Sequence, residues 1–69
     1  MPLSLANANE EKYIKKIGGN PETKQFLENL GFVVGTMIKV ISSISGNLIV
    51  QVKESRVAIS REMANKIIV

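Results

Sequence analysis

The chain has 69 residues, a formal net charge of +3 and 45% hydrophobic residues, enough for one compact core and one domain over residues 1–69. It contains no cysteine and no histidine, and all six of its acidic residues are glutamates. These absences exclude disulfides, thiolate or imidazole metal sites, and the residue sets of hydrolytic triads. We therefore expect a binding module without a cofactor, and not an enzyme.

The sequence gives no sign of membrane insertion or export. No apolar run approaches the roughly 18 residues of a membrane span. Ala6-Asn7-Ala8 looks like a signal-peptidase site, but the segment before it is too short for an apolar core and carries no basic side chain. The lack of cysteine fits a reducing compartment. We expect a soluble, cytoplasmic protein.

The charged residues allow only weak ligand sites. Three lysines fall within residues 12–16, and they either attract phosphate or anionic lipid or simply cover a solvated strand face. The pair Glu10-Glu11, or Glu22 with Glu28, offers two carboxylates without a third ligand. Such a pair binds a divalent cation at best weakly, so we expect no dedicated metal site.

In chain order, residues 1–9 form an extended lead-in that offers Leu3 and Leu5 to the core. A strand follows from Glu11 to Ile17, with Tyr13 and Ile17, or Ile14, on its buried side, and Gly18-Gly19 ends it.

A helix then begins at residue 20 and runs to about Leu30. Asn20 is a good N-cap, Pro21 suits the first turn, and Glu22 complements the helix dipole. The apolar face of this short helix, Phe26, Leu27 and Leu30, has to dock on a sheet because so short a helix is unstable in isolation.

The helix stops at Gly31, where a left-handed backbone is expected, and Phe32 can fold back onto the last helical turn. Phe32, Val33 and Val34 cannot all face inward on so short a bridge before Gly35. Either a bent junction buries all three, or at least one of them, with Val33 the first candidate, joins an exposed apolar patch that marks a contact site.

The rest of the chain predicts a strand meander. Residues 36–44 form one strand, Ser45-Gly46-Asn47 a tight turn with positive φ at Gly and Asn, and residues 48–52 a half-buried strand. Residues 53–56 turn into a strand over 57–59. Ser60 caps a single helical turn, and residues 66–69 form a last short strand. Five short strands close a core best as a small, strongly bent barrel. The fold class we expect is mainly β with one or two short helices, an SH3-like five-stranded barrel with an α-helix between its first two main strands.

These elements carry a resemblance to the FeoA family, which covers almost the whole chain. The matching motifs are Pro2-Leu3, Ile14 to Gly19, Phe26-Leu27, Leu30-Gly31-Phe32-Val33-Val34-Gly35, Ile38 and Val40, Gly46 to Val50, and Ser55 to Ser60 with Ala64 and Ile67. The chain departs from the family pattern at Asn7-Ala8-Asn9-Glu10, where many relatives turn on glycine. Asn tolerates the left-handed conformation as well, so the fold expectation is unaffected.

The resemblance implies a non-enzymatic accessory of ferrous iron uptake that binds a FeoB-type membrane GTPase transporter on its cytoplasmic side. It also implies transition metal ion binding as a property of the family. The candidate partner-binding residues are Phe32, Val33, Val34, Met37 and Arg56. Met37, Ile41 and Ile44 should lie opposite Ile38 and Val40, where they extend the apolar patch, form a homodimer surface, or turn into the core. An apolar edge strand ending at Val69 would allow a homodimer.

Two alternatives stay open. A small nucleic-acid-binding barrel would need a basic stripe with stacking aromatics, yet of the three aromatic residues Phe26 and Phe32 are expected in the core. The same domain type also forms the C-terminus of metal-dependent repressors, where it is fused to a DNA-binding domain. The absence of that domain here favours the transporter accessory.

Overall fold

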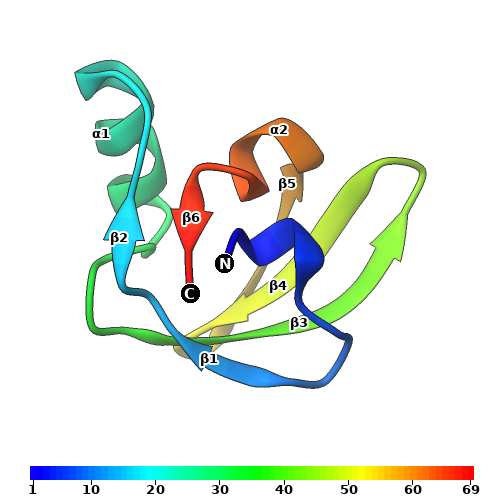
Figure 1. Ribbon diagram of the computed structural model, residues 1–69. Coiled ribbons are helices and arrows are strands. Elements are labelled where there is room, and N and C mark those ends of the chain that lie inside the picture. Colours follow the sequence, from blue (N-terminus) through cyan, green and yellow to red (C-terminus); the bar gives the residue numbers. More distant parts are fainter.

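The computed structural model describes all residues, 1–69, as two antiparallel sheets and two helices (Figure 1). The elements in chain order are a 3₁₀ turn η1 (Leu3–Leu5), β1 (Glu11–Tyr13), β2 (Lys16–Ile17), α1 (Pro21–Asn29), β3 (Met37–Ile44), β4 (Asn47–Val52), β5 (Ser55–Ser60), α2 (Arg61–Ala64) and β6 (Ile67–Ile68). One sheet has the order β1-β3-β4-β5, and the other pairs β2 with β6. The expected mainly β class with two short helices is confirmed.

The first predicted strand is two strands, because the chain changes sheets at Ile14. The Ile14 N–H donates to the Thr36 carbonyl at 3.0 Å, whereas the Lys15 N–H donates to the Ile68 carbonyl at 2.7 Å. This switch interrupts the alternation of the side chains. As a result Ile14 and Ile17 are buried and Tyr13 is exposed, so the prediction that Tyr13 shares the buried side is wrong.

One hydrophobic core joins both sheets to both helices. Its 14 buried residues are all apolar and come from nearly every element: Leu3, Ile14, Ile17, Leu27, Phe32, Ile38, Val40, Leu48, Val50, Val52, Ile59, Ala64, Ile67 and Val69. Leu5 was expected in this core but is exposed, because the lead-in is a 3₁₀ turn that directs only Leu3 inward. Phe26 was expected there too and is about half exposed, since Leu27 occupies the centre of the docked helical face.

The predicted helix caps are confirmed. Asn20 Oδ1 accepts a hydrogen bond from the Thr23 N–H at 2.8 Å, and Ser60 Oγ accepts one from the Met63 N–H at 3.2 Å. Each cap satisfies a backbone donor that the first turn of a helix leaves free. The caps therefore fix where α1 and α2 begin.

The hairpins contain one expected and two unexpected features. Residues 45 and 46 make a two-residue turn in which Ser45 has φ 48° and Gly46 has φ 80°, so Ser45 and not Asn47 takes the second positive φ. The predicted alternation holds at Val40, but a bulge at Ile41 follows, and Ile41 is only half-buried while Ile44 is exposed. The hairpin turn between β4 and β5 contains Lys53 with φ 55°.

The last strand is not a free edge. It pairs with β2 on one side, and on the other Pro2 forms a bridge to Ile68 while Met1 and Val69 exchange two backbone hydrogen bonds of 2.8 Å. Figure 1 shows the two chain ends lying together beside β6. The free apolar edge expected at Val69 is therefore absent, because that edge is occupied and Val69 is buried, and a homodimer stays a prediction.

Candidate partner-binding site

The bridge after α1 has two parts, and the first turns back into the core. The Gly31 N–H donates to the Glu28 carbonyl and the Phe32 N–H to the Leu27 carbonyl, both at 2.9 Å. With φ +106° at Gly31, this is a Schellman cap, which brings the residue after the glycine back over the last helical turn. Phe32 is consequently fully buried, and its assignment to the partner surface is corrected: its side chain is a core residue.

The second part of the bridge is a turn that projects the next two side chains outward. The Thr36 N–H donates to the Val33 carbonyl at 3.0 Å, and Gly35 has φ +91°, as the third residue of a type II turn requires. The turn is held against the residue that follows β1, because the Gly35 N–H donates to the Ile14 carbonyl at 2.8 Å. Val33 and Val34 stand at this turn with 43% and 58% of their surface exposed.

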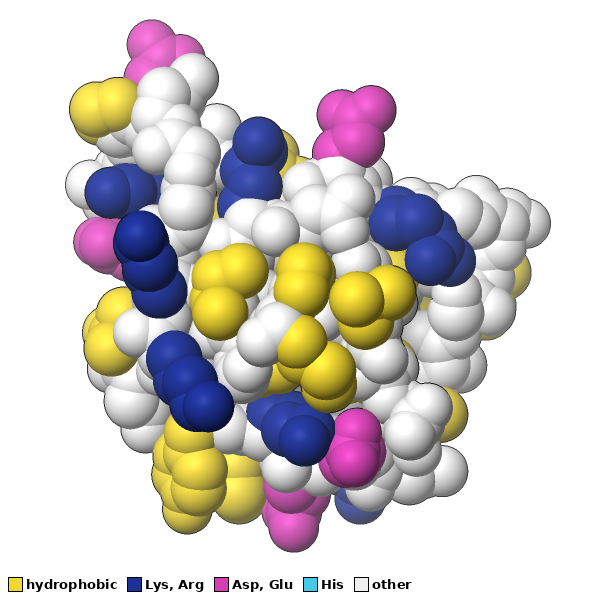
Figure 2. All heavy atoms as spheres, viewed as in Figure 1, with side chains coloured by type: hydrophobic (Ala, Val, Ile, Leu, Met, Phe, Trp, Pro, Cys, Tyr) yellow, Lys and Arg dark blue, Asp and Glu magenta, His cyan; other side chains and the backbone are white.

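Val33 and Val34 line a groove between the turn, β2 and α1, which we call the basic groove. It has a volume of about 380 Å³ and is lined by Lys15, Lys16, Ile17, Lys24, Glu28, Phe32, Val33 and Val34. Figure 2 shows a row of basic side chains running down this side of the molecule over α1 and β2, with hydrophobic side chains beside it. The groove thus combines an apolar rim, Val33 and Val34, with three lysines and one glutamate.

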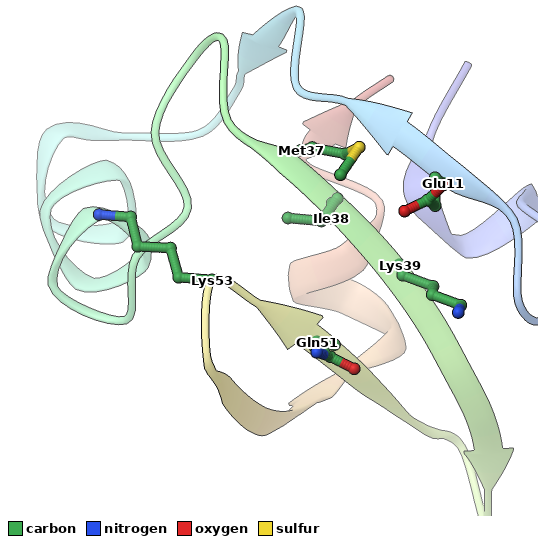
Figure 3. A pocket seen from close by; sticks show the side chains of 6 residues that line it. All are labelled: Glu11, Met37, Ile38, Lys39, Gln51 and Lys53. Carbon is green, nitrogen blue, oxygen red and sulfur yellow. The ribbon is translucent and has the colours of Figure 1, made fainter.

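Met37 lies in a different and smaller hollow on the outer face of the larger sheet. This sheet pocket of about 190 Å³ is lined by Glu11, Met37, Ile38, Lys39, Gln51 and Lys53. Figure 3 shows these side chains rising from β1, β3, β4 and the turn that follows β4. Tyr13 is the cross-strand partner of Met37 and is also exposed, so these two form the apolar part of that surface.

Arg56 lies apart from both hollows. It is exposed on β5, the edge strand, opposite Gln51, and its side chain makes no hydrogen bond or ion pair within the molecule. The structure therefore brings together Val33 and Val34 but not the other exposed candidates, Met37 and Arg56.

Sequence reasoning missed Lys24 and Glu28 as neighbours of the exposed valines. Both lie on one face of α1 because residues four apart stack along a helix. That spacing was a usable signal, but the face could be placed beside β2 only once the helix was docked. Of the three lysines within residues 12–16, Lys12 lies outside the groove and pairs with Glu10 at 3.7 Å.

Metal-ligating clusters and membrane-spanning helices are both absent from the structure. No three His, Cys, Asp or Glu side chains lie together where they could hold a metal ion. Neither helix has the length and apolar character needed to cross a membrane. What the structure does present is an exposed apolar turn beside unpaired lysines, which suits the binding of another molecule.

The fold is that of a small, mainly β, SH3-like domain. A family model described as the FeoA domain matches residues 1–69, and the chain belongs to the FeoA family. A curated relative, "Putative Fe(2+) transport protein A" of Methanocaldococcus jannaschii, is 38% identical over 68 residues, which cover 99% of this chain and 83% of the relative.

Solved structures agree on the fold. An iron uptake regulatory protein (FeoA) superposes with a TM-score of 0.90 at 26% identity, covering 97% of this chain and 91% of that one. A FeoA of Stenotrophomonas maltophilia complexed with zinc, described as a prokaryotic SH3 domain protein, gives 0.85 at 23% identity, with 99% and 87% covered. A manganese-dependent transcriptional repressor gives 0.89 at 14% identity over 97% of this chain and 39% of the repressor, which shows a shared fold.

Proposed function

We propose that this protein is a non-enzymatic, cytoplasmic accessory of ferrous iron uptake that acts by binding a FeoB-type membrane GTPase transporter. Family membership supports the process, since the archaeal relative carries the name of an Fe(2+) transport protein. The chain supplies no histidine, cysteine or aspartate for a catalytic set, so its contribution is one of contact.

The observation that carries the proposal is the exposure of Val33 and Val34 on an anchored turn. Exposed apolar side chains cost solvation, and a cluster of them on a folded surface marks a contact site. Here the Schellman cap and the type II turn hold both valines outward on rigid backbone, with Gly35 bonded to Ile14. The site is therefore formed before a partner arrives, which lowers the entropy lost on binding.

The test is a binding titration against the detergent-solubilised transporter of the same organism, with and without guanine nucleotide. We expect saturable binding that Val33→Glu weakens at least about tenfold, because it places a charge in a desolvated apolar contact. Ile44→Glu is the matched control: Ile44 is 59% exposed at the far tip of the β3–β4 hairpin, so this change should alter the affinity less than about twofold.

The outcomes distinguish whether the protein binds the transporter from where on its surface the contact lies. Equal affinities for both variants would leave the role in place and move the contact away from the turn. No binding in any nucleotide state would refute the proposal, and salt-sensitive oligonucleotide binding in its place would establish the nucleic-acid alternative. Circular dichroism of each variant checks that the fold is intact.

A further inference from the structure

The lysines of the basic groove are free of internal partners. Lys15, Lys16 and Lys24 are exposed, and the one ion pair of the molecule joins two residues elsewhere. Glu28 is the only acidic side chain in the lining. Like charges gathered around a recess concentrate the positive potential there and attract carboxylates or phosphates.

The same groove has an apolar component that a simple anion would not use. The exposed Val33 and Val34 form one rim, whereas Ile17 and Phe32 lie buried beneath the groove and offer an occupant little or no surface. An occupant that fills the groove therefore has to carry negative charge toward β2 and α1 and apolar side chains toward the turn. A free phosphate or carboxylate satisfies only the first requirement.

We propose that the basic groove binds an acidic, partly apolar segment of a partner polypeptide. The inference rests on the proposed function in that the transporter is the partner expected to supply this segment. Carboxylates of the segment pair with Lys15, Lys16 and Lys24, while its apolar side chains pack on Val33 and Val34. Glu28 at the rim repels a uniformly anionic ligand and so favours a segment whose charges are spaced by neutral residues.

The geometry disfavours the other anionic partners. A bilayer surface is broad, so lipid headgroups would meet the protruding lysines without filling the recess between α1 and β2. Single-stranded nucleic acid needs exposed aromatic rings for base stacking, and the one aromatic residue of the groove, Phe32, is buried. A polypeptide segment matches both the charge and the apolar rim.

The direct test uses NMR of the ¹⁵N-labelled protein titrated with a synthetic decapeptide that alternates glutamate with leucine or valine, up to roughly millimolar concentration. We expect saturable amide shifts at residues 15–17, 24, 33 and 34. The same peptide with glutamine in place of glutamate should bind at least about tenfold more weakly, and raising the salt from about 0.05 to 0.3 M should weaken the acidic peptide.

Two double variants distinguish the effect of charges within the groove from the effect of the protein's net charge. K15E/K16E should lower the affinity for the acidic peptide at least about tenfold. K53E/R61E changes the net charge by the same amount at exposed positions outside the groove, and should change the affinity less than about threefold. Equal losses in both, shifts centred on the sheet pocket, or no saturable shift would overturn the inference. Co-sedimentation with phosphatidylglycerol vesicles through these lysines, without peptide binding, would overturn it in favour of a membrane surface.

The transporter titration distinguishes a failure of this inference from a failure of the proposed function. If the transporter binds the wild type and K15E/K16E equally, the groove is not the site and the inference fails while the proposed function stands. If the transporter does not bind at all, the proposed function fails, and the peptide titration still decides whether the groove accepts acidic segments.

Discussion

Alanine substitutions at Gly31 and Gly35 form a matched pair, because only the new Cβ at position 31 would clash with a neighbouring side chain. Both glycines have positive φ, +106° and +91°, so alanine at either position costs roughly 1–2 kcal/mol of backbone strain. Part of that is offset because alanine restricts the unfolded chain by about 0.4–1 kcal/mol. A Cβ at Gly35 would meet nothing within 4 Å, whereas one at Gly31 would lie 2.9 Å from Val52 Cγ1.

The overlap decides the difference between the two variants. Val52 is only 2% exposed and is held in β4, so it has little room to move. Overpacking of this kind costs about 1–3 kcal/mol. We therefore expect Gly35→Ala to lower the free energy of unfolding by about 1 kcal/mol and Gly31→Ala by about 2–4 kcal/mol.

Urea denaturation followed by circular dichroism measures both values, since a domain of this size is expected to unfold in one cooperative step. The double variant Gly31→Ala/Val52→Ala tests the cause. In the wild-type protein, Val52→Ala should lower the free energy of unfolding by about 2 kcal/mol. In the Gly31→Ala background the same substitution should cost about 1–2 kcal/mol less, because it also removes the methyl group that clashes with the new Cβ. Costs for the two glycine variants that agree within about 0.5 kcal/mol, or a double variant that is simply additive, would refute the steric account.

Four further substitutions are checked by the same denaturation curves. Phe32→Ala should lower the free energy of unfolding by about 3–5 kcal/mol because the side chain is fully buried. Val34→Ala at the exposed turn should change it by no more than about 0.5 kcal/mol. Similar values for the two variants would contradict the division of the bridge into a buried and an exposed part. Asn20→Ala removes the side-chain oxygen that accepts from the Thr23 N–H and should cost about 1 kcal/mol, so no loss would mean that water replaces the cap. Ser45→Asn should stabilise by roughly 0.5–1 kcal/mol because asparagine tolerates the φ of 48° better in a two-residue hairpin turn; a destabilised protein would argue against that turn.

Local signals predicted the helices and their ends. Asn20 before Pro21 and Gly31 after Leu30 are short-range cap signatures, and the backbone bonds that satisfy them involve neighbouring residues. The strand over residues 11–17 was predicted less well. Its division depends on Ile14 and Lys15 pairing with segments more than 20 residues away, Thr36 and Ile68, and no local pattern specifies that.

The candidate site was only partly predictable for the same reason. A run of three apolar residues after Gly31 indicated that some would be exposed, but which ones depends on the Schellman cap that turns Phe32 inward and the turn that projects Val33 and Val34. The basic groove is built from three segments that are separate in the sequence, β2, α1 and the turn. Its lysines were visible as a charge bias, and their common surface is a product of the tertiary fold.

The meeting of the two chain ends beside β6 makes the fold nearly a closed ring. Because Met1 and Val69 are already joined by two backbone hydrogen bonds, a short linker could connect these two residues with little displacement of either one. New ends could then be placed at the exposed Ser45-Gly46 tip, far along the chain from the bridge that carries the valines. The domain is thus suited to circular permutation, and equally to insertion into a loop of another protein, with the basic groove left unchanged.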